Sequence, residues 1–101
     1  MSIYATVTAK AAPGKMAAAM EWAMKIRDLL NDTFSVDIEV LTNIGADAWT
    51  IHWITKYDSL AQYVETYGQM WANEEYQALI QEGDAAGLIS EVSTSLYRVA
   101  P

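Results

Sequence analysis

Four segments of the chain alternate between apolar and polar residues with a period of two, and this pattern restricts the possible fold more than any other feature. The segments cover residues 3–9, 34–42, 48–57 and 89–99. Successive side chains of a β-strand point to opposite faces of a sheet. The segments therefore predict four strands that share one apolar face, and a second face of hydroxyl groups, carboxylates and the single histidine, His52.

Two longer segments carry apolar residues at the spacing of an amphipathic helix. Residues 14–31 repeat apolar side chains every three or four positions, and residues 59–82 do the same after Ser59, a typical N-cap residue. Asn73 is a second typical cap, so we expect the later helix to be interrupted there. We expect one apolar stripe of this helix to be buried: Leu60, Tyr63, Val64, Tyr67 and Trp71.

The order of these elements predicts an α+β fold of the ferredoxin-like βαββαβ type. With right-handed crossovers, the strands form a four-stranded antiparallel sheet in the order 4-1-3-2 with both helices on one face. A chain of 101 residues is long enough for one such sandwich, so residues 1–101 are predicted to be a single domain. A hairpin centred on residues 43–48 places Glu39 opposite His52, to within one or two residues.

Composition excludes several classes of protein. The formal charge of −7 argues against nucleic-acid binding, which needs clustered Lys and Arg. No apolar run approaches the roughly 20 residues that span a bilayer, so no membrane partner is expected. The chain has no cysteine, which excludes disulfides and thiolate metal sites and is typical of a cytoplasmic protein.

The chain resembles the dimeric α+β barrel superfamily, which includes antibiotic-biosynthesis monooxygenase-like proteins, NIPSNAP-like proteins and small polyketide cyclases. Residues 49–53 (Trp-Thr-Ile-His-Trp), 57–63, 73–79 and 96–99 carry the resemblance. It implies a homodimer in which two sheets pack by their helix-free faces, and a ligand cavity, often between sheet and helices. Haem-degrading members use a helix histidine as iron ligand, whereas His52 lies in a predicted strand. We therefore expect no haem and no other cofactor.

His52 and Glu39 are the candidate catalytic residues. A carboxylate beside an imidazole favours the protonated ring and fixes its tautomer, as general acid–base catalysis requires. The same pair is also ordinary on a polar sheet face, where charged residues protect an edge strand. One histidine and two carboxylates show no ligand spacing, so no metal is expected.

A set of large aromatic residues should meet between the sheet and the helices. The candidate ligand-binding residues are Trp49, Trp53, Tyr63, Tyr67 and Trp71, with Met20, Met24 and Arg27 from the first helix. Facing the small side chains of Ala5 and Ala9, they either leave a slot or fill the core. Arg27 falls in the apolar arc of its helix, where it could bind a ligand carboxylate or extend to solvent.

The sequence thus predicts a homodimeric protein that binds an apolar or amphipathic small molecule, fatty-acid-like or polyketide-like. The alternative is a cofactor-free monooxygenase, cyclase or isomerase acting on such a molecule. Strand parity points His52 away from Trp53, so the acid–base residues and the aromatic slot lie on opposite faces of the sheet. Whether the protein is an enzyme is left open by the sequence.

Overall fold

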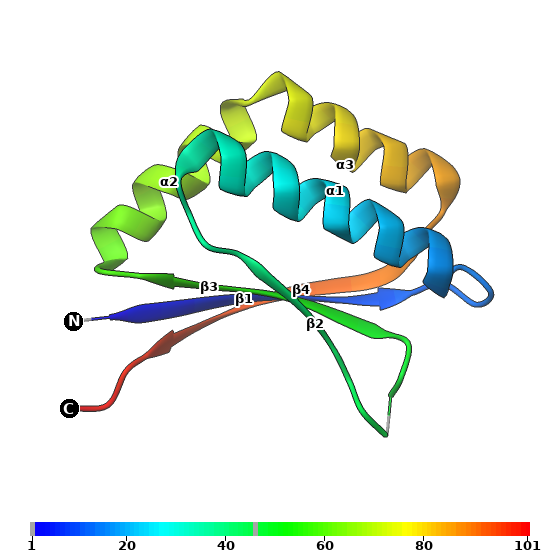
Figure 1. The fold of residues 1–101 in the computed structure, drawn as a ribbon, viewed down its shortest axis with the longest axis horizontal. Coiled ribbons are helices and arrows are strands. Elements are labelled where there is room, and N and C mark those ends of the chain that lie inside the picture. The colour runs from blue at the N-terminus through cyan, green and yellow to red at the C-terminus, as the bar shows by residue number, and fades with distance from the viewer. Residues whose placement is uncertain (1, 46) are drawn as a thin grey trace.

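The computed structural model describes residues 2–45 and 47–101. Residue 46, within the turn predicted over 43–48, lies outside the described residues. The elements in chain order are β1 (Ile3–Ala11), α1 (Met16–Phe34), β2 (Glu39–Thr42), β3 (Thr50–Tyr57), α2 (Leu60–Ala72), α3 (Glu74–Ala86) and β4 (Ile89–Arg98). The strands form one antiparallel sheet in the order β2-β3-β1-β4. This is the predicted 4-1-3-2 order, and the helices lie on one face of it (Figure 1).

The strand register builds the predicted apolar face. In the central strand β1, Ala5 lies between Thr55 and Leu96, and Ala9 lies between Ile51 and Val92. Helix α1 packs on this face through a buried row of side chains: Ala19, Ala23, Ile26 and Leu30. Because these residues recur every three or four positions, one side of the helix stays dry against the sheet.

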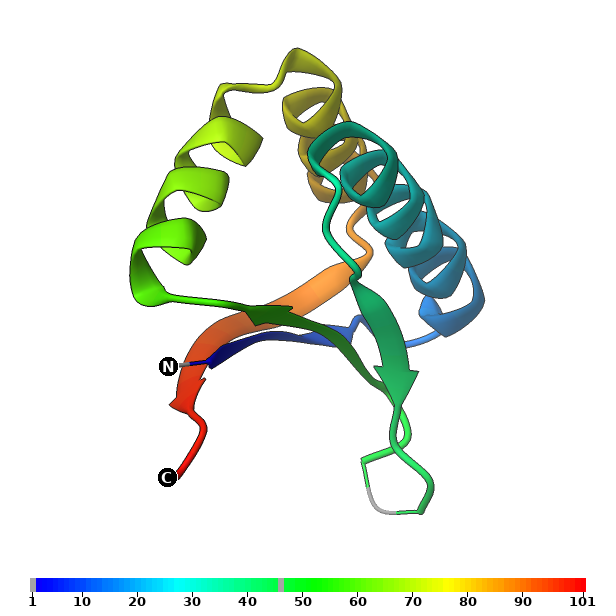
Figure 2. The same ribbon diagram turned by 60° about the vertical axis from the view of Figure 1, so that its left-hand side comes forward.

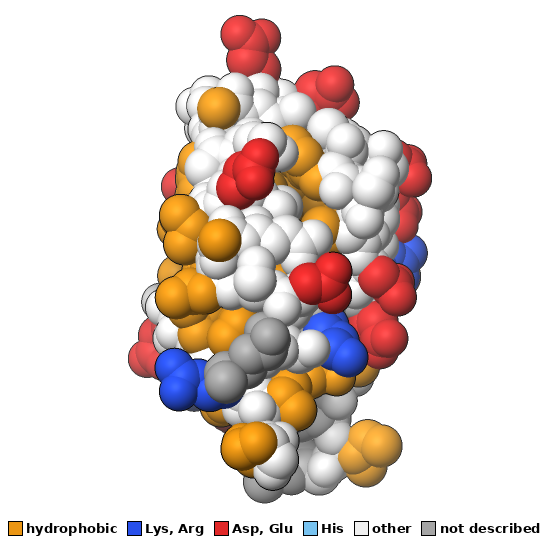
Figure 3. Space-filling view, turned by 90° about the vertical axis from the view of Figure 1, so that its left-hand side faces the viewer, with side chains coloured by type: hydrophobic (Ala, Val, Ile, Leu, Met, Phe, Trp, Pro, Cys, Tyr) orange, Lys and Arg blue, Asp and Glu red, His pale blue; other side chains and the backbone are white. Residues whose placement is uncertain are grey.

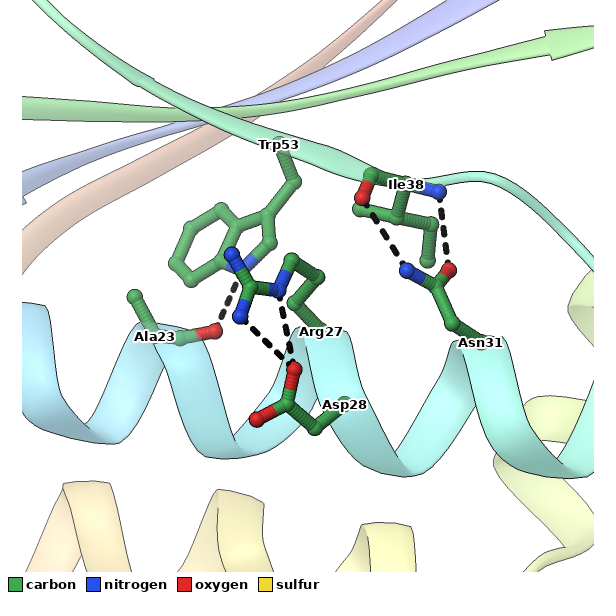
Figure 4. Close-up of polar contacts among 6 residues, drawn as sticks. All are labelled: Ala23, Arg27, Asp28, Asn31, Ile38 and Trp53. Atoms are coloured by element: carbon green, nitrogen blue, oxygen red, sulfur yellow. Dashed lines mark hydrogen bonds and ion pairs between the residues drawn. The ribbon is translucent and has the colours of Figure 1, made fainter.

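The segment predicted as a strand over residues 34–42 is wrong in its first half. Helix α1 continues to Phe34 and ends at Ser35, which adopts a left-handed conformation with φ 52°. Strand β2 begins only at Glu39. The Asn31 side chain holds the preceding segment instead: it accepts from the Ile38 backbone N–H at 2.8 Å and donates to the Ile38 carbonyl at 3.1 Å (Figure 4). Ile38 is thereby buried although it is not paired with a residue of β3.

The predicted interruption of the second helical segment is confirmed. The Ser59 hydroxyl accepts from the Gln62 backbone N–H at 3.1 Å, and Asn73 Oδ1 accepts from the Tyr76 N–H at 2.9 Å. Each bond satisfies a backbone donor that the first turn of a helix leaves unpaired. Figure 2 shows the consequence: α1 and α3 lie side by side, while α2 stands apart from them over another part of the sheet.

The predicted buried stripe of α2 is largely wrong. Its inward row is the half-buried Tyr63 with the buried Thr66 and Met70. The other predicted residues lie beside this row and are exposed: Leu60 by 53%, Val64 by 59%, Tyr67 by 47% and Trp71 by 43%. The apolar side of α2 was predicted correctly, but the helix is rotated so that only one edge of this apolar side meets the sheet.

None of the helices in the described part of the chain is long and apolar enough to cross a membrane.

Candidate functional site

A cavity of about 390 Å³ lies between the apolar face of the sheet and the helices. The floor includes Ala5, Val7 and Ala9 of β1, whose small side chains leave space above the sheet. Residues from α1, α2, α3, β3 and β4, together with Ile38 before β2, complete the lining. Seven of them are aromatic: Trp22, Trp53, Tyr57, Tyr63, Tyr67, Trp71 and Tyr76. The volume is within the range of about 300–1,000 Å³ typical of small-molecule sites.

Five of these rings form a continuous chain along the cavity. The centroids of successive rings are separated by 5.4 Å from Tyr57 to Tyr63, 5.7 Å from Tyr63 to Tyr67, 6.2 Å from Tyr67 to Trp71, and 5.1 Å from Trp71 to Tyr76. Three of the four contacts are edge-to-face, the arrangement that the ring quadrupole favours. The chain of rings therefore links the end of β3, α2 and the start of α3 into one aromatic wall.

The two remaining rings are fixed by backbone hydrogen bonds. Trp53 Nε1 donates to the Ala23 carbonyl at 3.2 Å (Figure 4), and Trp22 Nε1 donates to the Leu79 carbonyl at 2.7 Å. The two indoles also meet edge to face, with centroids 5.9 Å apart. Because both indole N–H groups are used within the protein, they are not free to bind a ligand.

Four of the residues that line the cavity are tyrosines, each with a hydroxyl group. Burial raises the pKa of Tyr57, Tyr63 and Tyr76, and in each case a neighbouring tyrosine adds to the rise. A hydrogen bond with Thr55 partly opposes the pKa rise at Tyr57. These phenols are therefore neutral hydrogen-bonding groups at ordinary pH and poor general bases.

Four of the eight predicted ligand-binding residues line the cavity: Trp53, Tyr63, Tyr67 and Trp71. Trp49 does not. It precedes β3, which begins at Thr50, and its side chain is 54% exposed, so strand parity does not extend to it. Met20 and Met24 are half-buried on α1 outside the lining.

Arg27 also lies outside the lining of the cavity. Its guanidinium donates twice to Asp28 Oδ1, from Nε at 2.9 Å and from Nη2 at 2.8 Å (Figure 4). The side chain is 30% exposed, so the charge is satisfied on the outside of α1. The structure therefore gives no support to a carboxylate clamp at Arg27.

The predicted pairing of Glu39 with His52 is shifted by two residues. Leu41 lies opposite His52, and Glu39 lies opposite Ile54. His52 binds two neutral residues instead, with Nδ1 3.0 Å from Thr8 Oγ1 and Nε2 2.8 Å from Asn43 Oδ1. Within the described residues, no ion pair joins Glu39 to the imidazole.

The partners of His52 favour one tautomer of its neutral ring. The Asn43 amide group donates to the Asp47 carbonyl at 3.0 Å, which orients Oδ1 toward the imidazole as an acceptor. Nε2 of a neutral ring must then donate, and Nδ1 accepts from the Thr8 hydroxyl. His52 lies on the helix-free face, with Thr8 and Ile54, and does not line the aromatic cavity. The geometry thus separates the predicted acid–base pair from the predicted ligand site.

Four further residues line the cavity and were not among the predicted site residues: Trp22, Tyr57, Tyr76 and Asp84. Tyr57 could have been found by extending the parity of β3 from Trp53, and Trp22 by its place on the apolar stripe of α1. Asp84 has no comparable signal, because it is a charged residue at the end of a helix. In the part of the chain that the structure describes, no group of three His, Asp or Glu residues is arranged to hold a metal.

Fold and site together define a ferredoxin-like α+β sandwich with an aromatic cavity between its sheet and helices. Comparison with protein families gives one match, to the NIPSNAP family, over residues 6–101. The chain therefore belongs to the NIPSNAP family, a member of the dimeric α+β barrel superfamily. A search of curated proteins finds no significant match.

Solved structures share this fold at low sequence identity. A NIPSNAP family protein from Agrobacterium tumefaciens is 16% identical with a TM-score of 0.77, over 98% of this chain and 86% of that one. An uncharacterized NIPSNAP domain protein from Burkholderia xenovorans is 10% identical with a TM-score of 0.81, over 97% and 94% of the two chains. A further A. tumefaciens protein is 13% identical with a TM-score of 0.81, over 97% and 93%. These similarities establish the fold.

Proposed function

We propose that the protein is a homodimeric small-molecule-binding protein whose ligand occupies the aromatic cavity. The ligand is an elongated apolar or amphipathic molecule, of fatty-acid-like or polyketide-like shape. The observation that carries this proposal is the cavity of about 390 Å³, which a wall of aromatic rings and the small residues of β1 keep open. Predominantly apolar cavities with a few polar groups are the usual form of ligand sites.

The helix-free face of the sheet supports the homodimer. All three helices lie on the other face (Figure 1), and apolar side chains on and beside the free face remain open: Leu41 is 42% exposed, Tyr97 57% and Val99 42%. Exposed apolar side chains on a sheet face that no described helix covers favour an interface there. Membership of a superfamily named for dimeric barrels agrees with a second copy of the chain as the partner.

The composition of the cavity favours binding over catalysis. Among the residues that line it there is no histidine, lysine or arginine, and Asp84 is the one carboxylate. The phenols of Tyr57 and Tyr76 have raised pKa values and do not act as bases near neutral pH. A monooxygenase, cyclase or isomerase would need a group that moves a proton at the substrate, and His52 lies on the opposite face of the sheet.

Native mass spectrometry of the purified protein and calorimetric titration with 1-octanol test this proposal together. We expect either a retained apolar molecule or saturable octanol binding with one site per chain. Thr94 of β4 lines the cavity, and it is exposed enough to accept a larger side chain. Thr94→Trp should therefore abolish binding, whereas Ala18→Trp, on the exposed side of α1, should leave it unchanged. Equal octanol affinity in both variants would rule out the cavity as the site.

A further inference from the structure

The cavity contains no cationic side chain to meet a ligand anion. Its lining holds one charged residue, Asp84, and no lysine, arginine or histidine. The nearby cations of α1 are paired on the outside: Lys25 Nζ lies 3.5 Å from Glu82 Oε1, and Arg27 binds Asp28. The whole chain, with 13 acidic and six basic residues, carries a net charge of −7. A carboxylate entering this site would therefore have no counter-ion.

The aromatic wall also favours a cationic ligand over an anionic one. The faces of tryptophan and tyrosine rings carry the negative part of the ring quadrupole, and they attract cations within about 6 Å of the ring centroid. Seven aromatic residues line the cavity, and the positive N–H edges of Trp22 and Trp53 are already bound to backbone carbonyls. The lining thus offers a ligand ring carbon, the hydroxyl groups of its tyrosines and threonines, and the Trp71 indole.

Asp84 supplies the single formal charge at this site. It lies near the end of α3, next to Gly83, whose backbone packs directly against the Trp22 indole. Asp84 is one of the lining residues and is also exposed to solvent, so it is accessible to a ligand that enters the cavity from water. A carboxylate beside an aromatic cavity attracts a cation through Coulomb interaction and repels an anion.

We propose that the ligand is a hydrophobic cation, an amine or quaternary ammonium with an aliphatic or aromatic body. The apolar body lies along the rings, and the positive group interacts with the aromatic faces and Asp84. This inference rests on the proposed function, because it names the chemical class of the molecule that the same cavity binds. It selects against free fatty acids, whose carboxylate the cavity does not neutralise.

Three probes with the same chain length test the charge preference by calorimetry: octyltrimethylammonium, 1-octanol and octanoate. We expect the cation to bind on the order of tenfold more tightly than the alcohol, as a partly desolvated cation–π contact supports. Octanoate should bind the most weakly. Octanol binding as tightly as the cation, or octanoate binding more tightly, overturns the inference and leaves the proposed function standing. Absence of binding by all three, with no retained molecule in native mass spectrometry, overturns the proposed function itself.

Two variants with the same change of net charge test whether Asp84 is the source of the preference for the cation over octanol. Asp84→Asn should reduce the preference for the cation over octanol and leave octanol affinity unchanged. Glu82→Gln removes a carboxylate that is paired with Lys25 outside the lining, so it should preserve the preference. An equal loss in both variants would mean that the overall charge of the protein, and not Asp84, selects the cation, and it would overturn this assignment.

Discussion

A Cβ atom placed on Gly83 would lie 2.6 Å from both Cε2 and Cζ2 of Trp22. The indole of α1 thus rests directly on the backbone of α3, and its Nε1 donates to the Leu79 carbonyl one turn earlier in that helix. Trp22 and Gly83 also line the cavity. The glycine therefore determines how closely α1 and α3 approach and where one wall of the cavity lies.

We predict that Gly83→Ala destabilises the protein by about 1–3 kcal/mol, because the added methyl group forces the indole or the helix to move. Gly68 in α2 is the matched control, since an added Cβ there meets nothing within 4 Å. Gly68→Ala should stabilise the protein by about 0.5–1 kcal/mol through its higher helix propensity. Urea unfolding followed by circular dichroism measures both. A gain in stability at both positions would show that Trp22 relocates without cost.

A second prediction concerns Asn31, which makes both backbone hydrogen bonds to Ile38. Asn31→Ala leaves an N–H and a carbonyl of the half-buried connection to β2 unpaired, and it should cost about 1–3 kcal/mol. Asp32→Ala, at an exposed position one residue later, should change the unfolding free energy by less than about 0.5 kcal/mol. Similar small changes in the two variants would indicate that water replaces the Asn31 amide.

The sheet and its order were predictable because alternation with period two is a local property of each strand. The same rule failed at residues 34–38, where Phe34 and Ile38 alternate like a strand but pack on the core from a helix end and a connection. Alternation shows which side chains are buried, and it does not show whether a neighbouring strand is present. Asn31 provides the missing backbone partners, and that contact spans seven residues with no sequence signature.

Only part of the candidate site could be predicted from the sequence, for a related reason. Aromatic residues on β3 and α2 indicated a cavity, and Trp53 and Tyr67 do line it. The register of β2 with β3 depends on the turn between them, so the shift that separates Glu39 from His52 could not be fixed from residue pattern alone. The rotation of α2 depends likewise on its break from α3. Figure 3 shows hydrophobic side chains along one side of the end of the molecule that carries both termini in Figure 1.

A third prediction follows from the pKa of Tyr57, which burial raises above its usual value near 10. In the unfolded chain this phenol loses its proton first, so the folded state binds more protons at alkaline pH. The associated stability is fully present below about pH 10 and is lost as the pH rises through the folded pKa. Tyr57→Phe should therefore make the decline of unfolding free energy between pH 9.5 and 11 shallower than in the wild type. Parallel declines in urea unfolding would mean that the Tyr57 hydroxyl is well solvated in the folded protein.

The last prediction concerns Tyr97, which lies opposite Tyr4 on the helix-free face and is 57% exposed. In a symmetric dimer closed by this face, each substitution appears twice in one interface, so Tyr97→Asp introduces two carboxylates into surface that should be dry. An interface of this kind buries more than about 1,000 Å². We expect light scattering at micromolar concentration to give a dimer for the wild type and a monomer for Tyr97→Asp.

Leu60→Asp, an equally exposed apolar position on α2, should remain dimeric. A wild-type monomer would refute the dimer, and a monomer from Leu60→Asp alone would move the interface to the helical side, where α2 presents its exposed apolar stripe.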